Sequence, residues 1–177
     1  MSINFLDLKE KAFEINKLLS KPGFLLTTEN KSTGEANTMT LGWGAVGYAW
    51  GKDIVAIMVR PSRYSYPILE ASDCFSLSFL DEESKDKIMF CGRNSGKDIN
   101  KFTECNFETD YYDNTLYIKG AKLTMLCKKL YEAKMELDGF EPSYKDLATK
   151  FYGEDGNAQG GLHKIYVAEI VKLFEEK

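Results

Sequence analysis

The spacing of hydrophobic residues changes from helical to strand-like soon after the N-terminus. Within residues 4–19, apolar side chains recur every three or four positions, at Phe5, Leu8, Ala12, Ile15 and Leu19. This spacing predicts one face of an amphipathic helix, and we expect that face, widened by Leu6 and Phe13, to pack on the core. Lys21-Pro22-Gly23 is expected to end the helix.

From residue 24 onward the pattern predicts strands. Residues 24–28, 36–50 and 53–59 are typical of three consecutive strands, with a hairpin-type turn at 30–34 and a second turn at 50–53. Ile54–Val59 contains no polar position, which predicts a strand that is buried on both faces.

The rest of the chain alternates between short helices and further strands. Short helices are predicted over residues 67–72, 82–91, 98–102 and 143–150, with Gly92 ending the second and Ser143 as N-cap of the last. Strands are predicted over residues 74–80, 115–120, 121–137 and 162–174. We therefore predict one mainly β domain spanning residues 1–177, a β-barrel with peripheral helices.

Length and charge narrow the class of protein. A chain of 177 residues has the length of one domain, and its net charge of −4 argues against a general nucleic-acid binder, which would carry a basic stripe. No apolar run approaches the ~20 residues of a transmembrane helix, and the N-terminal segment lacks the hydrophobic core of a signal peptide. We expect a cytoplasmic protein that binds neither nucleic acid nor membranes.

The cysteines do not form a metal-binding or disulfide pattern. Cys74, Cys91, Cys105 and Cys127 include no CxxC pair, and the chain has a single histidine, so a zinc cluster of the usual type cannot be completed. We expect reduced thiols and no metal site. Cys91, in a glycine-rich loop, is the candidate for higher reactivity.

A cluster of guanidinium and hydroxyl groups directly follows the apolar strand, in the run Arg60-Pro61-Ser62-Arg63-Tyr64-Ser65-Tyr66. Arginine matches phosphate or carboxylate oxygens with a planar fork, and hydroxyls add further hydrogen bonds. Pro61 stiffens the backbone, and Ser65 is expected to be the N-cap of the short helix that follows, where an anion is favoured. The alternative is a surface turn with solvated arginines, and composition alone leaves the two interpretations about even.

The glycine-rich run Gly92–Asp98 invites comparison with a P-loop. Three residues rather than four separate Gly92 from Gly96, and Asp98 stands where a Mg²⁺-binding hydroxyl belongs, which disfavours a nucleoside triphosphatase. A looser role remains, in which the loop presents backbone N–H groups and Lys97 to an anion or a polar ring edge. The alternative is a plain helix C-cap and turn.

Several ordered blocks between residues 25 and 171 carry a resemblance to a known family. Asn37-Thr38-Met39-Thr40, Gly42-Trp43-Gly44, the run from Val59 to Tyr66, the loop 91–98 and the final strand from His163 resemble the flavin reductase-like, FMN-binding split-barrel family, which includes flavoredoxin. The resemblance implies a split β-barrel of Greek-key type and a homodimer with FMN near the subunit interface. It implies FMN contacts at Asn37, Thr38, Met39, Thr40, Trp43, Arg60, Pro61, Ser62, Arg63, Tyr64, Ser65, Cys91, Ser95, Gly96, Lys97 and Asp98. For Trp43, packing in the core is the alternative.

His163 occupies the place where this family commonly has a histidine close to the flavin ring. The family's frequent Gly-Asp-x-His arrangement is Gly160-Gly161-Leu162-His163 here, so the acid that would orient the imidazole is absent. His163 is therefore the catalytic candidate by resemblance, and a surface or packing residue is the alternative.

These features lead to one main functional hypothesis and two alternatives. The first is a flavin reductase, an FMN-dependent oxidoreductase that passes electrons from NAD(P)H, through FMN, to free flavin, a metal complex or a protein. No GxGxxG fingerprint is present, so the nicotinamide would stack directly on the flavin. The second is a flavin-binding electron carrier without hydride chemistry of its own. The third is a split-barrel protein that binds another planar ligand, such as haem or a pyridoxal-type phosphate.

Overall fold

The computed structural model describes residues 3–20 and 23–176. Seven strands form one sheet in the order β3-β2-β6-β9-β10-β5-β4, with β1 added on β10, and a separate hairpin pairs β7 with β8. All of these pairs are antiparallel. The strands are β1 Ile3–Phe5, β2 Phe24–Asn30, β3 Glu35–Leu41, β4 Gly44–Ala49, β5 Lys52–Val59, β6 Cys74–Phe79, β7 Thr109–Tyr112, β8 Thr115–Ile118, β9 Leu123–Lys134 and β10 Lys164–Glu176.

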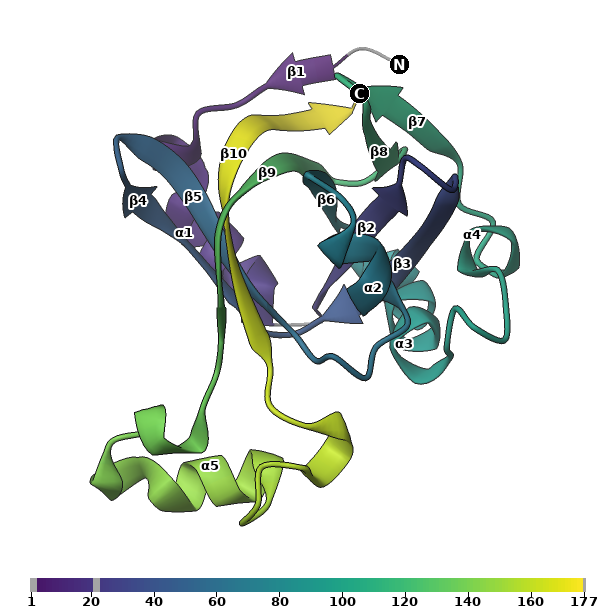
Figure 1. Ribbon diagram of the computed structural model, residues 1–177. Helices are drawn as coiled ribbons and strands as arrows, with labels where there is room; N and C mark the ends of the chain where they lie inside the picture. The colour runs from purple at the N-terminus through teal and green to yellow at the C-terminus, as the bar shows by residue number, and fades with distance from the viewer. Residues whose placement is uncertain (1–2, 21–22, 177) are drawn as a thin grey trace.

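Helices lie outside the curved sheet (Figure 1). α3 and α4 lie beside β3, α1 lies near β4 and β5, and α5 lies away from the barrel at the end of the long β9–β10 ribbon. The α-helices are α1 Leu8–Ser20, α2 Ser65–Glu70, α3 Lys85–Arg93, α4 Lys101–Glu104 and α5 Lys145–Tyr152, and short 3-10 helices cover Glu82–Ser84, Leu137–Gly139, Pro142–Tyr144 and Ala158–Gly160. The prediction of a mainly β fold with peripheral helices is confirmed.

The sheet is open between its two end strands, β3 and β4, which are consecutive in the chain. The predicted strand 36–50 is therefore two strands, and the chain crosses the opening at Gly42-Trp43. Gly44, directly after Trp43, lies close to β5, since a Cβ there would be 3.0 Å from the Ala56 carbonyl oxygen. Trp43 therefore stands at the edge of this opening.

The core fills the inside of the curved sheet, and β5 shows its boundary. Val55, Ile57 and Val59 are fully buried, whereas the intervening Ile54, Ala56 and Met58 are only half-buried. The prediction that β5 is buried on both faces is wrong, because its second face lines a cavity rather than a second core layer. An apolar run alone does not distinguish these two environments.

The first helix starts later than predicted. It begins at Leu8, because residues 3–5 pair with β10 as a strand. Leu8, Ile15 and Leu19 are buried as expected, but Phe5 and Phe13 are 52% and 76% exposed and do not join the core. Lys21 and Pro22, the predicted helix end, lie outside the described residues.

Other boundaries differ at turn residues. Gly92 does not end a helix, since α3 continues to Arg93, and Ser143 is not an N-cap but part of a 3-10 turn before α5. The predicted strand 121–137 is β9, which ends at Lys134, and the last strand begins at Lys164 rather than at residue 162. The hairpin strand β7 was not predicted.

Candidate functional site

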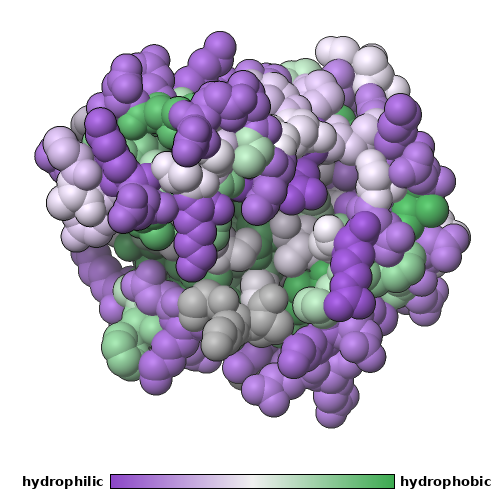
Figure 2. Space-filling view, turned by 90° about the horizontal axis from the view of Figure 1, so that it is seen from below, coloured by the Kyte–Doolittle hydropathy of each residue, from purple (hydrophilic) through white to green (hydrophobic). Residues whose placement is uncertain are grey.

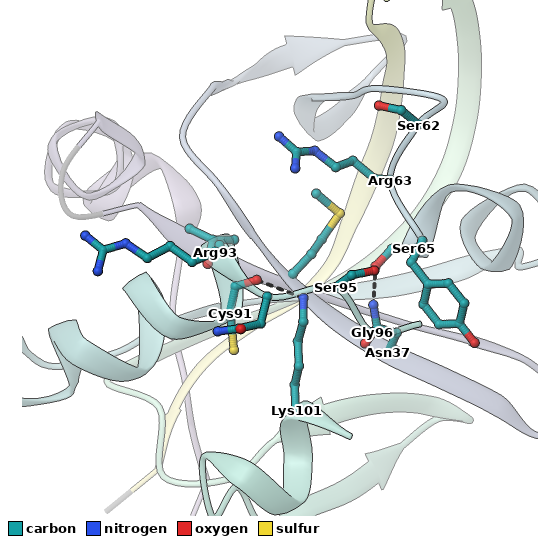
Figure 3. A pocket seen from close by; sticks show the side chains of 14 residues that line it. Asn37, Ser62, Arg63, Ser65, Cys91, Arg93, Ser95, Gly96 and Lys101 are labelled. Atoms are coloured by element: carbon teal, nitrogen blue, oxygen red, sulfur yellow. Dashed lines mark hydrogen bonds between the residues drawn. The ribbon is translucent and has the colours of Figure 1, made fainter. Parts of the chain in front are cut away.

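A cavity of about 210 Å³ lies where the loop after β5 meets β3 and the α3–α4 segment (Figure 3). We call it the polar cavity. Its lining residues are mostly polar, and none is acidic: Asn37, Met39, Thr40, Ser62, Arg63, Tyr64, Ser65, Cys91, Gly92, Arg93, Asn94, Ser95, Gly96 and Lys101. Three of them, Arg63, Arg93 and Lys101, carry a positive charge. A cavity with several cations and no carboxylate on its wall is suited to an anion.

Lys101 is the least expected member of this wall. It is 3% exposed, and its Nζ donates to the Cys91 carbonyl oxygen at 2.8 Å. None of the described carboxylates forms an ion pair with it. Burial lowers the pKa of this lysine, an effect that Cys91 opposes and Arg63 reinforces. A buried ammonium with spare donors and no counter-ion is costly unless a ligand supplies the negative charge.

The local structure explains how Lys101 reaches the cavity. Asn100 is the N-cap of α4, and its side-chain oxygen accepts from the backbone N–H groups of Phe102 and Thr103. Lys101 is thus the first residue of α4, and its side chain extends toward the cavity from the side opposite Arg63 (Figure 3).

A side-chain hydrogen bond on the wall of the polar cavity joins β3 to α2. Asn37 Nδ2 donates to Ser65 Oγ at 2.8 Å. The prediction that Ser65 is the N-cap of α2 is wrong: Tyr64 occupies that position without a side-chain cap bond. Gly96 approaches this pair so closely that a Cβ there would overlap the Asn37 carboxamide. The absence of a side chain at Gly96 therefore keeps Asn37 in place.

Arg60 does not line the polar cavity. It is 4% exposed, and its guanidinium donates to four backbone carbonyls, those of Phe151, Ala158, Gln159 and Gly161, at 2.7–3.3 Å. Burial lowers its pKa. Arg60 thus ties the end of β5 to the last turn of α5 and to the connection between α5 and β10.

A second cavity of about 240 Å³ adjoins the polar cavity, since both are lined by Met39, Thr40 and Arg63. We call it the junction cavity. Trp43 lies on its wall, with its ring centroid 4.9 Å from that of His163 and 5.0 Å from that of Phe151. An aromatic wall next to a cationic one suits a ligand with a flat ring and a negatively charged end.

His163 is neutral in this setting. Its Nδ1 lies 2.8 Å from the Tyr152 hydroxyl. Burial, reinforced by the charges of Arg60 and Arg63, lowers the pKa of His163 to about 4. At neutral pH the imidazole can donate or accept a hydrogen bond, but it carries no charge.

A third, larger cavity of about 560 Å³ adjoins the junction cavity through Trp43, Met58 and Phe151. We call it the apolar cavity, because none of its lining residues is charged: Asn16, Leu19, Gly42, Trp43, Gly44, Ala45, Ala56, Met58, Met135, Phe140, Leu147, Phe151 and Tyr152. Figure 2 views the molecule from below and shows hydrophobic residues in a recessed area bordered by hydrophilic ones. The three cavities adjoin one another through shared lining residues, and we call them together the groove, which has a cationic end and an apolar end.

Comparison with known proteins places the chain in a family. A sequence model of the flavin reductase like domain matches residues 17–177. The chain belongs to this family. No curated protein matches the sequence.

Solved structures of similar fold agree with the family. Flavoredoxin from Methanosarcina acetivorans is 23% identical, with a TM-score of 0.64 over 88% of this chain and 69% of that one. An FMN-binding domain of a flavin reductases-like enzyme from Shewanella baltica is 17% identical, with a TM-score of 0.66 over 98% and 77%. Flavoredoxin of Desulfovibrio vulgaris is 15% identical, with a TM-score of 0.65 over 88% and 70%. The fold is the split β-barrel of flavin reductase-like proteins, as predicted.

The groove gathers most of the predicted cofactor residues of this flavin reductase-like chain. Ten line the polar cavity, namely Asn37, Met39, Thr40, Ser62, Arg63, Tyr64, Ser65, Cys91, Ser95 and Gly96. Trp43, Arg60 and His163 line the junction cavity. Thr38 is buried and bonded to Thr27 and the Leu26 carbonyl. Pro61, Lys97 and Asp98 are exposed and line neither of these two cavities.

Two features of the site differ from the sequence reasoning. Cys91 lies on α3, 1% exposed and 3.8 Å from the Cys105 sulfur, and burial raises its pKa to about 12. The expectation of a reactive thiol is therefore wrong. Arg93 and Lys101 on the cavity wall were missed. Arg93 lies within the glycine-rich block that carried the resemblance, but no sequence pattern separates Lys101 from the other lysines.

The described residues give no indication of a metal site or a membrane span. Within residues 3–20 and 23–176, no group of histidine, cysteine and acidic side chains could hold a metal ion. None of the described helices combines the length and apolar character needed to cross a bilayer.

Proposed function

We propose that this protein binds FMN in the groove, with the phosphate in the polar cavity and the ring toward the junction cavity. The observation that carries the proposal is the polar cavity, which has three cations and no carboxylate on its wall and adjoins a cavity with aromatic side chains on its wall. FMN has two matching features in the same order, an anionic end and a flat ring. The family and its FMN-binding structural neighbours support this choice of ligand.

Each part of the wall has a distinct task. Arg63 and Lys101 supply charge-assisted hydrogen bonds to the phosphate. The backbone of Met39 and Thr40 lies where the two cavities meet and can bond the polar edge of the ring. Trp43 and His163 limit the space beside the ring. Bound FMN would supply the hydride and electron chemistry, while the protein supplies binding, orientation and electrostatics.

The reaction we propose is electron transfer from a reduced nicotinamide, through FMN, to free flavin, a metal complex or a protein. The uncharged apolar cavity next to the ring position gives space for a second reactant. A flavin-binding electron carrier is the second candidate, favoured by the fold similarity to flavoredoxins. Steady-state oxidation of NADH and NADPH distinguishes the two, because a carrier without hydride chemistry gives no turnover with either.

We further propose that the protein forms a homodimer and that it is located in the cytoplasm. Tyr48, Trp50 and Tyr131 are each more than half exposed, and the Trp50 and Tyr131 rings lie 6.5 Å apart. Exposed aromatic side chains grouped in this way are typical of an association surface. Sedimentation velocity tests the proposal, and a monomer at micromolar concentration would refute it.

The spectrum of the freshly purified protein tests the cofactor. The expected result is an oxidised-flavin absorbance whose released chromophore has the mass of FMN. A colourless protein whose spectrum and fluorescence do not respond to added FMN would overturn the proposal. A haem or pyridoxal-type spectrum would replace FMN with another planar ligand.

A further inference from the structure

The single histidine of the chain has only one of its two ring nitrogens engaged. Nδ1 of His163 lies 2.8 Å from the Tyr152 hydroxyl, and no described residue forms a hydrogen bond with Nε2. The ring lines the junction cavity. Gly161 stands where the family's acid would be, so Tyr152 is the polar partner that this chain provides for the imidazole.

The direction of this hydrogen bond follows from the chemistry of the two groups. A neutral imidazole nitrogen is a strong acceptor and a phenol hydroxyl is a good donor, whereas a phenol oxygen accepts weakly. The other neighbour of the Tyr152 hydroxyl is the Met135 sulfur at 3.9 Å, a weak acceptor. Burial raises the pKa of Tyr152, so the phenol keeps its proton. The hydroxyl therefore donates to Nδ1, and the imidazole proton lies on Nε2.

Tyr152 is itself held firmly. It is 3% exposed at the end of α5, with the Arg60 guanidinium carbon 5.0 Å from its ring centroid and the Phe140 ring at 6.1 Å. Arg60 also binds the Phe151 carbonyl. Arg60, which holds the end of α5, thus also holds the phenol next to His163.

We propose that Tyr152 is a positioning residue that holds His163 as the Nε2–H tautomer and so gives the junction cavity a neutral hydrogen-bond donor. The ligand group that it takes is a carbonyl oxygen or an unprotonated ring nitrogen on a planar, uncharged ring. The ligand half of the proposal rests on the proposed function, and the tautomer half does not. Two sources of such an acceptor reach this point: the flavin ring itself, and a second reactant from the apolar cavity.

The tautomer can be measured directly because the chain has one histidine. ¹⁵N-histidine labelling of the full chain, with any affinity tag removed, gives two imidazole nitrogens, and long-range ¹H–¹⁵N correlation assigns them. At pH 7 without added flavin, the expected result is a protonated-type Nε2 and an unprotonated, hydrogen-bonded Nδ1. A protonated Nδ1 would overturn the proposal whether or not the protein binds FMN.

Tyr152→Phe removes only the hydroxyl and keeps the packed ring. The Nδ1 resonance is then expected to move downfield, toward the value of an unprotonated nitrogen without a hydrogen bond. Tyr144→Phe, at an exposed tyrosine that lines none of the three cavities, is the matched control and leaves Nδ1 unchanged. An unmoved Nδ1 in folded Tyr152→Phe protein would show that the hydroxyl does not act on the imidazole.

Adding two ligands in turn identifies the group that accepts the hydrogen bond from Nε2–H. A change in the chemical shift of the Nε2–H proton on addition of FMN assigns the flavin ring as the partner. A change that occurs only when acetophenone is added to FMN-saturated protein assigns the second reactant. If FMN binds but neither addition moves that resonance, the ligand half of the proposal is wrong. If FMN does not bind, the proposed function has failed while the tautomer result stands.

Discussion

Replacing Lys101 with methionine separates a binding role of this side chain from a structural one. Methionine fills similar space in a buried site but has no charge. A charge-assisted hydrogen bond contributes about 1.5–3 kcal/mol, so its loss is expected to weaken FMN binding roughly 10- to 150-fold. Fluorescence titration of flavin-free protein measures this change.

The stability of the flavin-free protein is expected to respond in the opposite direction. The pKa of Lys101 is lowered mainly by burial, which means that the folded state disfavours the charged form and that the charge lowers stability at neutral pH. The free energy of unfolding of Lys101→Met, from urea denaturation, should therefore stay unchanged or rise.

Lys97→Met is the matched control on the same segment. Lys97 is exposed and does not line the polar cavity, so screening by solvent keeps its contribution below about 1 kcal/mol. A Lys101→Met protein that is less stable but binds FMN normally would refute the reasoning, because it would make Lys101 a structural residue.

Three further outcomes follow from the geometry. Gly96→Ala forces the Asn37 carboxamide away from Ser65. FMN binding should weaken at least tenfold, with little loss of secondary structure by circular dichroism, and a normal affinity would contradict this expectation. Arg60→Met leaves four carbonyls without their donor and should lower the free energy of unfolding by about 2–5 kcal/mol. Amide hydrogen exchange in residues 151–161 should become faster, and unchanged exchange there would show that Arg60 does not hold this segment. His163 has a folded pKa of about 4 against an ordinary value of 6.5, so the unfolded state binds its proton first as the pH falls. Wild-type stability should therefore drop by about 1–3 kcal/mol relative to His163→Gln between pH 6.5 and pH 4, and parallel pH profiles would refute this.

Local patterns predicted the strands and hairpins that depend on neighbouring residues. The turn at residues 30–34 and the strand β10 follow from alternation and turn chemistry, and they are present in the fold. The break at Gly42-Trp43 was missed because the apolar pattern continues through it. The opening of the barrel between β3 and β4 depends on pairing with distant strands, which no local pattern records.

The site shows the same division. The run after β5 predicted a cluster of hydroxyl and guanidinium groups suited to an anion, and Ser62, Arg63 and Ser65 line the polar cavity. Its two arginines have the same side-chain chemistry, yet Arg63 faces the cavity while Arg60 binds four carbonyls of residues 151–161. Lys101 and Tyr152 gain their roles from burial and from contacts across the fold, so neither could be selected from the sequence.

The most direct test of the account compares FMN with riboflavin, which has the same ring but no phosphate, in titrations of the flavin-free protein. The account predicts that FMN binds at least tenfold more tightly than riboflavin and that Lys101→Met reduces this preference. Equal affinity for the two flavins, or binding of neither, would contradict a phosphate site formed by Arg63 and Lys101.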